Sequence, residues 1–503
     1  MESLHTKNIP VDVIEVLSVL KKEGYEAWIV GGCVRDLILG RTPKDWDVTT
    51  NALPETIVSL FPKTVYENTF GTVAVVFEHA KKSDKGTQKE YFIVEVTPYR
   101  TEGKYTDFRH PDEVHFTQNL SEDLKRRDFT VNAMAFDPLE NDNGRLVDEF
   151  GGMSDIKDRV LKTVGRAEDR FTEDALRMMR AIRFSTQLGF TIEGDTLTAI
   201  STLKNLIKEI SQERIKDEFE KIIMSPDPVM GIGLLQKLGL LTHIIPELEE
   251  GVGCEQKGEH IYDVFEHVLH ALGHASEKNW PLHIRLAALF HDIGKPRTRR
   301  WDGTKAGGVG KYTFYGHEVV GAHMTKKIME RMKFPKDLTE IVVKLVRYHM
   351  FFSDTEAITL SAVRRTIVNI GRENIWDLME VRECDRVGMK KKEASYRLRK
   401  YHAMIEEALR APTSVGMLKI NGEVLIKELG IKPGPRMGWI LHALLEECLE
   451  DDTKNTVEYL KSHTLELDKL SDVELKALGD KGKEKKEEVE EGELKEIRKK
   501  HKI

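Results

Sequence analysis

The chain has 503 residues, of which 40% are hydrophobic and 32% are charged, and its net charge is −7. This composition indicates a folded protein of several domains and excludes a strongly basic chain, so any contact with nucleic acid must come from local basic patches. No run approaches the roughly 20 apolar residues of a membrane span, and the N-terminal residues lack the pattern of a signal peptide.

The first motif is a glycine turn between a strand and a helix. An apolar strand is predicted over residues 25–30, and a helix over 34–39 carries Arg35 in its first turn. Gly31 and Gly32 between them allow a sharp turn that brings backbone N–H groups close to a ligand. A strand, a glycine turn and a helix N-terminus together form an anion-binding site.

A pair of carboxylates follows this turn. Asp45 and Asp47 flank Trp46 at a spacing typical of a strand, which places both carboxylates on one face, where they can bind one hard cation. Alone, a glycine pair is typical of a tight turn and an acidic pair of a solvated loop. Their combination, with Arg35 between them, favours metal-assisted phosphoryl transfer.

The remainder of the first domain carries one more acidic candidate. Glu95 lies between two apolar residues of a predicted strand, and a charge there needs a partner. It is either an outward-facing residue or a third carboxylate on the face of the acidic pair. The other expected elements are helices over 11–23 and 53–61, strands over 65–67, 72–78 and 91–97, a hairpin tip over 80–89 and a long functional loop over 98–120.

An arginine pair begins the next motif, Arg-Arg-Asp-Phe-Thr-Val-Asn-Ala-Met. Arg126 and Arg127 offer guanidinium groups that bind phosphate with two hydrogen bonds, although a surface turn with salt bridges would also contain them. The same run contains Asp128 and Asn132.

These motifs resemble those of the nucleotidyltransferase superfamily that includes DNA polymerase β. The pattern Gly-Gly-x-Val-Arg-Asp, then Asp-x-Asp, then the arginine motif is similar to the class II CCA-adding tRNA nucleotidyltransferases and bacterial poly(A) polymerases. The resemblance implies that Asp45 and Asp47 bind Mg²⁺, with Glu95 as a third acid. It also implies that Gly32, Arg35 and Arg127 contact the nucleotide, with Asp128 and Asn132 as scaffolding or ribose contacts. Residues 98–120 would form the loop used in adding A.

A second stripe of charges lies on a predicted helix, where Asp174, Arg177, Arg180 and Arg183 recur every three residues. Ion pairs three residues apart would explain it at about 0.2–0.5 kcal/mol each. Alternatively, the aspartate accepts a hydrogen bond from the exocyclic amine of cytosine or adenine and an arginine donates to the ring nitrogen. The family resemblance favours base selection by Asp174 and Arg177, with Arg180 and Arg183 as support or phosphate contacts.

An ordered set of histidines and aspartates forms a third constellation. Imidazoles and carboxylates are good ligands for transition metals, although any single histidine can be an ordinary core residue. The set resembles that of the HD phosphohydrolase domain, which implies hydrolysis of a phosphomonoester or cyclic phosphodiester, with Lys295 near a phosphate. The implied first-metal ligands are His267, His291, Asp292 and Asp385, and the implied second-metal ligands are His317 and His349.

The predicted fold class is α+β, a mixed-sheet nucleotidyltransferase head followed by all-α segments. Residues 391–412 are basic and are the candidate tRNA contact, and residues 458–503 are expected to be a frayed helix or disordered. The expected domains are a head over 1–138, a neck over 139–220, an HD domain over 221–390, a tRNA-binding region over 391–457 and a charged tail over 458–503.

The function expected from the resemblance is addition of CCA to tRNA from CTP and ATP, with Mg²⁺ in the head and a transition metal in the HD domain. An A-adding enzyme, a poly(A) polymerase and an RNA-binding HD phosphohydrolase with an inactive head remain alternatives. The four cysteines are far apart without a Cys-x-x-Cys, so we expect no disulfide framework or zinc cluster and a cytoplasmic location. The sequence leaves the oligomeric state open.

Overall fold

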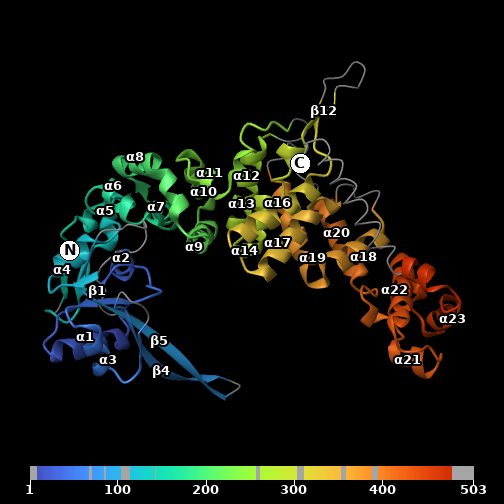
Figure 1. Ribbon diagram of the computed structural model, residues 1–503, viewed down its shortest axis with the longest axis horizontal. Helices are drawn as coiled ribbons and strands as arrows, with labels where there is room; N and C mark the ends of the chain where they lie inside the picture. Colours follow the sequence, from blue (N-terminus) through green and yellow to red (C-terminus); the bar gives the residue numbers. More distant parts are fainter. Residues whose placement is uncertain are drawn as a thin grey trace. The chain divides into compact units, whose positions relative to one another are not determined.

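The structure, a computed structural model, describes residues 8–66, 71–83, 86–103, 114–141, 143–256, 261–302, 311–352, 358–387 and 395–478. The chain divides into two compact units, Met1–Ile244 and Ile245–Ile503, which we describe separately (Figure 1). The predicted α+β class is confirmed, since a mixed sheet near the N-terminus is followed by helices. The predicted boundary between residues 220 and 221 falls inside a helix of the first unit.

A seven-stranded sheet forms the head of the first unit, in the strand order β3-β4-β5-β2-β1-β8-β9. Neighbouring strands are antiparallel except for β2 and β5, which are parallel. The strands are β1 (Ala27–Val30), β2 (Asp47–Thr50), β3 (Thr64–Tyr66), β4 (Val73–Ser83), β5 (Gly86–Pro98), β8 (Ala135–Asp137) and β9 (Arg145–Val147).

One face of the sheet carries the acidic side chains of the central strands. Val30 of β1 lies in register with Asp47 of β2, and Asp47 lies in register with Glu95 of β5, so these three side chains share a face. Helix α4 (Leu120–Lys125) packs on that face through Leu124. Helices α1 (Val11–Lys22) and α3 (Pro54–Leu60) pack against each other and against β5 (Figure 1).

Two predicted loops of the head differ from the observed structure. Strands β4 and β5 continue through most of 80–89, where the sequence predicts a hairpin tip, and form a long ribbon (Figure 1). The predicted loop over 98–120 contains a short ladder of β6 (Arg100–Glu102) and β7 (Val114–Phe116). Residues 104–113 of that loop lie outside the described residues.

The rest of the first unit is helical apart from a two-stranded ladder of β10 (Val160–Leu161) and β11 (Thr191–Ile192). Its helices are α2 (Gly32–Ile38), α5 (Gly152–Asp158), α6 (Ala167–Glu173), α7 (Leu176–Leu188), α8 (Gly194–Leu203), α9 (Gln212–Ile223), α10 (Pro228–Lys237) and α11 (Leu241–Ile244), with 3-10 turns at Thr130–Asn132 and Lys204–Glu209.

Helix α7 carries the three arginines of the predicted stripe and is held by its apolar face. The prediction that Asp174 lies on the same helix is wrong, because Asp174 is extended and ends α6 before α7 begins. Met178, Met179 and Ile182 are buried at helical spacing, and Gly189 ends the helix in the left-handed region at φ 72°. Helix α9 packs against α7 through a similar buried stripe that includes Phe219. Helices α7 and α9 therefore pack together beside the predicted base-reading residues.

The second unit is also mainly helical, with a short ladder of β12 (Arg300–Asp302) and β13 (Lys311–Thr313). Its first helices are α12 (Pro246–Glu249), α13 (Val264–Glu277), α14 (Leu282–Phe290), α15 (Lys295–Thr298), α16 (His317–Arg331), α17 (Lys336–Tyr348), α18 (Leu360–Ile370) and α19 (Ile375–Asp385). Its last helices are α20 (Ser395–Ala408), α21 (Gly422–Lys427), α22 (Pro435–Glu450) and α23 (Val457–Leu467). Short 3-10 turns occur at His349–Phe352, Arg372–Asn374, Val415–Met417 and Asp452–Lys454. Across the described residues, no helix combines the length and apolarity needed to cross a membrane.

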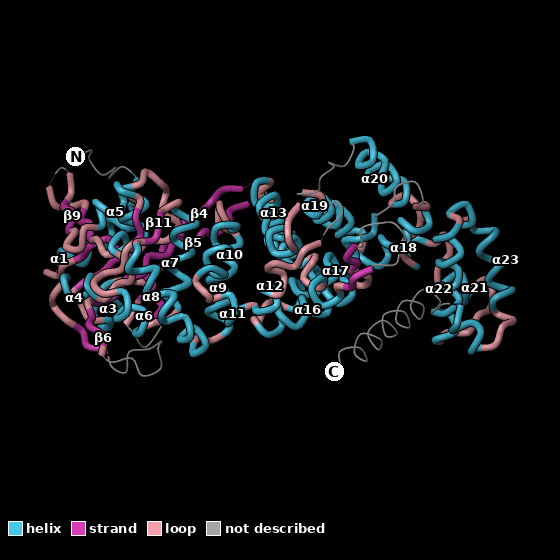
Figure 2. Tube along the Cα trace, turned by 90° about the horizontal axis from the view of Figure 1, so that it is seen from above, coloured by secondary structure: helices cyan, strands magenta, loops and turns pink. Residues whose placement is uncertain are grey.

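The end of the described chain corrects the predicted tail. One buried cluster contains Leu460 and Leu467 of α23, Leu475 after that helix, and residues of α21 and α22. Helices α21, α22 and α23 lie together (Figure 2). The folded part therefore continues past residue 457 to at least residue 475, because leucines spaced along an otherwise charged segment supply a buried stripe. Residues 479–503 lie outside the described part, as do the lysines at 390–392.

We expect Leu460→Ala to destabilise this C-terminal cluster by about 2–5 kcal/mol, since Leu460 is fully buried. Hydrogen exchange of the amides of α22 and α23 measures the loss locally, which suits a chain of more than one unit. The matched control is Leu465→Ala on the same helix, whose side chain is 47% exposed and should change exchange little. Equal effects of the two variants would contradict a folded α23.

Candidate functional site

The turn between β1 and α2 packs against two charged side chains. Gly31 has φ +79°, which favours glycine, and a Cβ built on it would lie 3.2 Å from Oδ2 of Asp47 and 3.2 Å from Nη1 of Arg127. The absence of a side chain thus allows the turn to approach both groups. Gly32 begins α2, so its backbone lies at the helix N-terminus, as predicted.

Asp47 and Glu95 lie on one face of the sheet, whereas Asp45 lies in a bend before β2 and not on the strand that its spacing predicts. Asp47 begins β2, Asp45 is exposed two residues before it, and Glu95 lies opposite Asp47 on β5. Burial raises the pKa of Asp47, the Arg127 guanidinium opposes this, and the charge of Asp45 raises the pKa further. A divalent cation would relieve this repulsion, and oxygen donors of this kind suit Mg²⁺.

Arg127 is held by an aspartate that the sequence did not single out. Its Nη2 donates to Oδ2 of Asp123 at 3.2 Å, while Nε and Nη2 of Arg126 donate to Oδ1 at 2.9 and 2.7 Å. Burial acts to raise the pKa of Asp123, but Arg126 and Arg127 together hold it below its usual range. Asp123 is fully buried and lies three and four residues before the arginines, a spacing that could have revealed it.

A second network joins the glycine turn to α7. Nη1 of Arg35 donates to Oδ1 of Asn132 at 2.6 Å, and the Nδ2 amide of Asn132 donates to Asp128 at 3.2 Å. Arg180 then donates to Oδ2 of Asp128 from Nε at 2.9 Å and Nη2 at 2.6 Å. Burial acts to raise the pKa of Asp128, but Arg180 and then Arg177 lower it to about 2. Arg35 and Arg180 therefore both support the site through Asp128.

The two predicted base-reading residues lie at the junction of α6 and α7, with Asp174 between the two helices and Arg177 in the first turn of α7. Arg177 donates from Nη1 to the carbonyl oxygen of Arg170 at 3.2 Å and to Glu173 at 2.5 Å, and from Nη2 to the carbonyl oxygen of Arg126 at 3.1 Å. That last bond connects the base-reading residues to the phosphate-binding motif. Asp174 accepts hydrogen bonds from Arg214 of α9, a partner 40 residues away that no local pattern indicates.

Arg183, the last residue of the stripe, has a different environment. Its Nη1 donates to Oε1 of Glu218 on α9 at 3.1 Å, and both side chains are buried. Its guanidinium also lies 4.2 Å from the centroid of the Phe184 ring. Burial lowers the pKa of Arg183 to about 10, although Glu218 opposes the shift. These contacts stabilise the α7–α9 pair, and a nucleotide contact by Arg183 stays a prediction.

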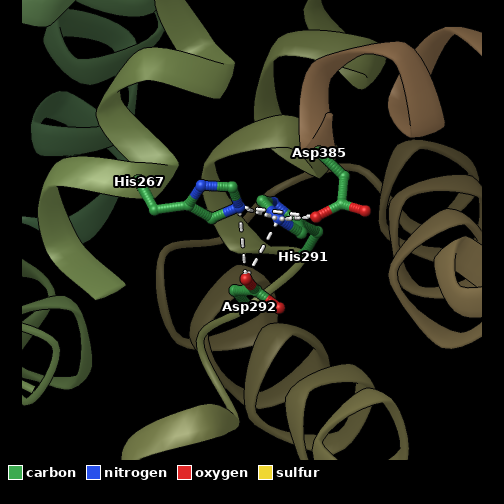
Figure 3. Close-up of side chains that lie close together, drawn as sticks. All are labelled: His267, His291, Asp292 and Asp385. Carbon is green, nitrogen blue, oxygen red and sulfur yellow. Dashed lines mark hydrogen bonds and ion pairs between the residues drawn. The ribbon is translucent and has the colours of Figure 1, made fainter. Parts of the chain in front are cut away.

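The histidines and aspartates predicted as metal ligands form two groups that share Asp292. Figure 3 shows the first group, in which the His267 ring points toward the two carboxylates. Nε2 of His267 lies 3.4 Å from Asp292 Oδ2 and 3.4 Å from Asp385 Oδ1, and Nε2 of His291 lies 3.3 and 3.4 Å from the same oxygens. In the second group, Nε2 of His317 lies 3.3 Å, and Nε2 of His349 3.7 Å, from Asp292 Oδ1.

The backbone orients these rings. Nδ1 of His291, His317 and His349 each bonds to a carbonyl oxygen three residues earlier, at 2.8, 2.8 and 2.7 Å, which leaves Nε2 toward the centre. Gly294 allows the close approach of two segments, since a Cβ there would lie 2.2 Å from the carbonyl oxygen of His317. The six residues come from α13, α14 with the turn after it, α16, the 3-10 turn after α17, and α19.

Burial and paired charges define the electrostatics of this centre. Burial acts to raise the pKa of Asp292, but Lys295 and His291 hold it well below its usual range. Nζ of Lys295 lies 2.6 Å from Asp292 Oδ2 and donates to Gln256 at 2.6 Å. Burial lowers the pKa of His349 to about 3, so its imidazole is neutral and suited to metal binding.

Three family models match consecutive parts of the chain. The model "Poly A polymerase head domain" matches residues 27–162, and "Probable RNA and SrmB- binding site of polymerase A" matches 189–251. The HD domain model matches 264–388, a range that contains all six residues of the buried centre.

Curated relatives cover both the N-terminal part and nearly the whole chain. The CCA-adding enzyme of Geobacillus thermodenitrificans is 41% identical over 295 residues, which are 57% of this chain and 65% of that enzyme. The CCA-adding enzyme of Lactobacillus delbrueckii subsp. bulgaricus is 32% identical over 465 residues, which are 91% of this chain and 98% of that enzyme.

Solved structures agree with these relatives. The crystal structure of Bacillus stearothermophilus CCA-adding enzyme in complex with CTP has a TM-score of 0.65 at 27% identity, covering 91% of this chain and 97% of that one. The Thermotoga maritima CCA-adding enzyme complexed with tRNA shares the fold, with a TM-score of 0.56 at 19% identity, 92% of this chain and 97% of that one. With a relative that is 32% identical and covered over 98% of its length, the chain belongs to the family of CCA-adding enzymes.

Proposed function

We propose that this chain adds C, C and A to the 3′ end of tRNA, using CTP and ATP and no nucleic-acid template. The observation that carries the proposal is the continuity of the site. The turn at Gly31 contacts Asp47 and Arg127, and the adjoining backbone of Arg126 accepts a hydrogen bond from Arg177 at the start of α7. Acidic, phosphate-binding and base-reading groups thus border one region.

Each group has a proposed role in nucleotidyl transfer. Asp45 and Asp47, with Glu95 as a third acid, would hold Mg²⁺, which when bound supplies positive charge at the reacting phosphate and lowers the pKa of the RNA 3′-hydroxyl. Arg127, fixed by Asp123, binds the triphosphate and stabilises charge on the departing pyrophosphate. The backbone of Gly32, at the N-terminus of α2, orients the same phosphates.

The choice between bases rests on Asp174 and Arg177. The aspartate accepts a hydrogen bond from the amine of cytosine or adenine, and the arginine donates to the ring nitrogen beside it. Uracil presents a carbonyl oxygen where the amine would be, so it leaves the carboxylate facing an acceptor. CTP and ATP therefore fit the same pair of side chains.

The proposal predicts ordered incorporation on tRNA transcripts that end before CCA, after C and after CC. With labelled CTP or ATP, the first two transcripts should accept C and the third should accept A. Addition of A to the CC-ended transcript alone would indicate an A-adding enzyme, and long A tails would indicate a poly(A) polymerase. A lack of incorporation on every transcript would refute the transferase function.

A second activity, hydrolysis of a phosphomonoester or cyclic phosphodiester, is proposed for the buried centre of the second unit. It rests on the two ligand groups that share Asp292, because nitrogen and carboxylate donors together suit a pair of divalent transition metals. Metals held by these residues would supply Lewis acidity to a phosphate. Lys295, beside Asp292, is placed to meet the charge of a substrate phosphate.

We also propose a cytoplasmic location. All four cysteines are free and buried in the structure, as expected of a chain that folds in a reducing compartment. The proposed partners are tRNA, CTP and ATP.

A further inference from the structure

We propose that Arg214 of α9 is a positioning residue for nucleotide choice, because it holds the Asp174 carboxylate in the orientation that reads the base. The inference rests on the proposed function and deepens it. Nη1 of Arg214 donates to Oδ1 of Asp174 at 3.3 Å, and Nη2 donates to Oδ2 at 2.7 Å. This bidentate pair fixes the plane of the carboxylate as well as its position.

The hydrogen bonds of Asp174 leave one of its oxygens available for a base. A carboxylate has about four acceptor positions, two on each oxygen. Oδ1 accepts from the backbone N–H of Leu176 at 3.0 Å and from Arg214, whereas Oδ2 accepts from Arg214 among the described contacts. Oδ2 therefore retains an acceptor position, and an exocyclic amine can donate to it.

Arg177 is constrained in a matching way. Its bonds to Arg170, Glu173 and Arg126 use three of its five N–H groups, so donors remain for a ring nitrogen. The backbone N–H of Arg177 also donates to the carbonyl oxygen of Asp174 at 3.0 Å, which links the two residues. One fixed acceptor and one fixed donor, held side by side, form an edge complementary to cytosine and adenine.

The position of Arg214 makes this constraint rigid. It lies in the first turn of α9, whose residues Ile215, Phe219 and Ile222 are buried against α7 and its neighbours. The Arg214 side chain is 25% exposed, so the ion pair is partly shielded from water. Without Arg214, the bond from Leu176 is the one that remains to the Asp174 carboxylate among the described residues, and the carboxylate can turn about it. A turned carboxylate no longer meets the base in hydrogen-bonding geometry, so the amine of cytosine gains less over the carbonyl oxygen of uracil.

The test is single-nucleotide incorporation by Arg214→Ala on the transcripts defined above, with each of the four nucleotides. We expect the ratio of kcat/KM for CTP to that for UTP to fall at least about tenfold, and the ratio for ATP to GTP to fall likewise. Arg214→Lys keeps the charge but cannot form the bidentate pair, so its ratios should stay close to those of Arg214→Ala. In an Asp174→Asn background, Arg214→Ala should have no further effect on the ratios.

The matched control is Lys221→Ala on the same helix, a half-exposed residue that should leave the ratios unchanged. A fall in incorporation of all four nucleotides with constant ratios would overturn the proposal and assign Arg214 a purely structural role. Full restoration by Arg214→Lys would also overturn it. Equilibrium binding of CTP and UTP to the same variants reports the same ratio without catalysis, so loss of the transferase function itself is distinguishable from failure of this inference.

Discussion

Replacement of either head aspartate should abolish nucleotide incorporation with little loss of folding. We expect Asp45→Asn and Asp47→Asn each to lower kcat by at least about 1,000-fold, because a bound metal contributes several kcal/mol and each 1.36 kcal/mol changes a rate tenfold. Single-turnover incorporation of C on the transcript without CCA measures the effect. An exposed residue of α1, changed as Glu15→Gln, is the control and should keep full activity.

The stability of the Asp47 variant provides an independent check. Burial, with a smaller contribution from Asp45, raises the pKa of Asp47 in the folded chain, so the folded state binds more protons than the unfolded state near that pKa. The metal-free protein therefore loses stability as the pH rises through this range. Asp47→Asn removes that penalty, and we expect its Tm at neutral pH without metal to equal or exceed that of the wild type. A large fall in Tm would attribute the lost activity to unfolding.

The second large effect concerns the buried centre of the second unit. Because Asp292 belongs to both ligand groups, Asp292→Asn should remove transition-metal binding from both, while His349→Ala should remove it from the second group only. Elemental analysis after equilibration with Mn²⁺ or Zn²⁺ measures the metal per chain. We expect nucleotide incorporation to persist in both variants, since the Asp45–Asp47 site belongs to the first unit.

Folding must be separated from ligand loss in this experiment. Removing one partner of a buried ion pair typically costs about 3–5 kcal/mol, and Asp292 is buried beside Lys295. His283→Ala is the histidine control, since His283 pairs with Asp377 outside both groups. If Asp292→Asn is folded by circular dichroism yet retains the metal content of the wild type, the shared-ligand arrangement is refuted.

Local sequence patterns predicted the groups that lie close together along the chain. The glycine turn depends on local turn geometry, which residue spacing encodes directly. The two acids of the pair are close together in the chain, but Asp45 lies in a bend before β2 rather than on the predicted strand. The histidine set was ordered along the chain, and the structure brings all six residues together in two groups. Glu95 is on the same sheet face as Asp47 because β2 and β5 pair in parallel register, a relation between distant strands.

Contacts between segments far apart in the chain could not be predicted from the sequence. Arg214 reaches Asp174 because α9 packs on α7, and Arg35 reaches Asn132 through a pairing 97 residues apart. The folded part extends to α23 although the charged run at 481–493 dominates the composition of residues 458–503, because Leu460 and Leu467 form a core with α21 and α22. Packing, rather than local propensity, decided each of these features.

The most direct test of the central claim is the 3′-end sequence of the product made by the wild-type protein. A tRNA transcript lacking CCA would be incubated with all four nucleotides in excess and sequenced at its end. The account predicts C, C and A, followed by no further addition. Ends that contain U or G, that stop after CC, or that extend into a run of A would contradict it.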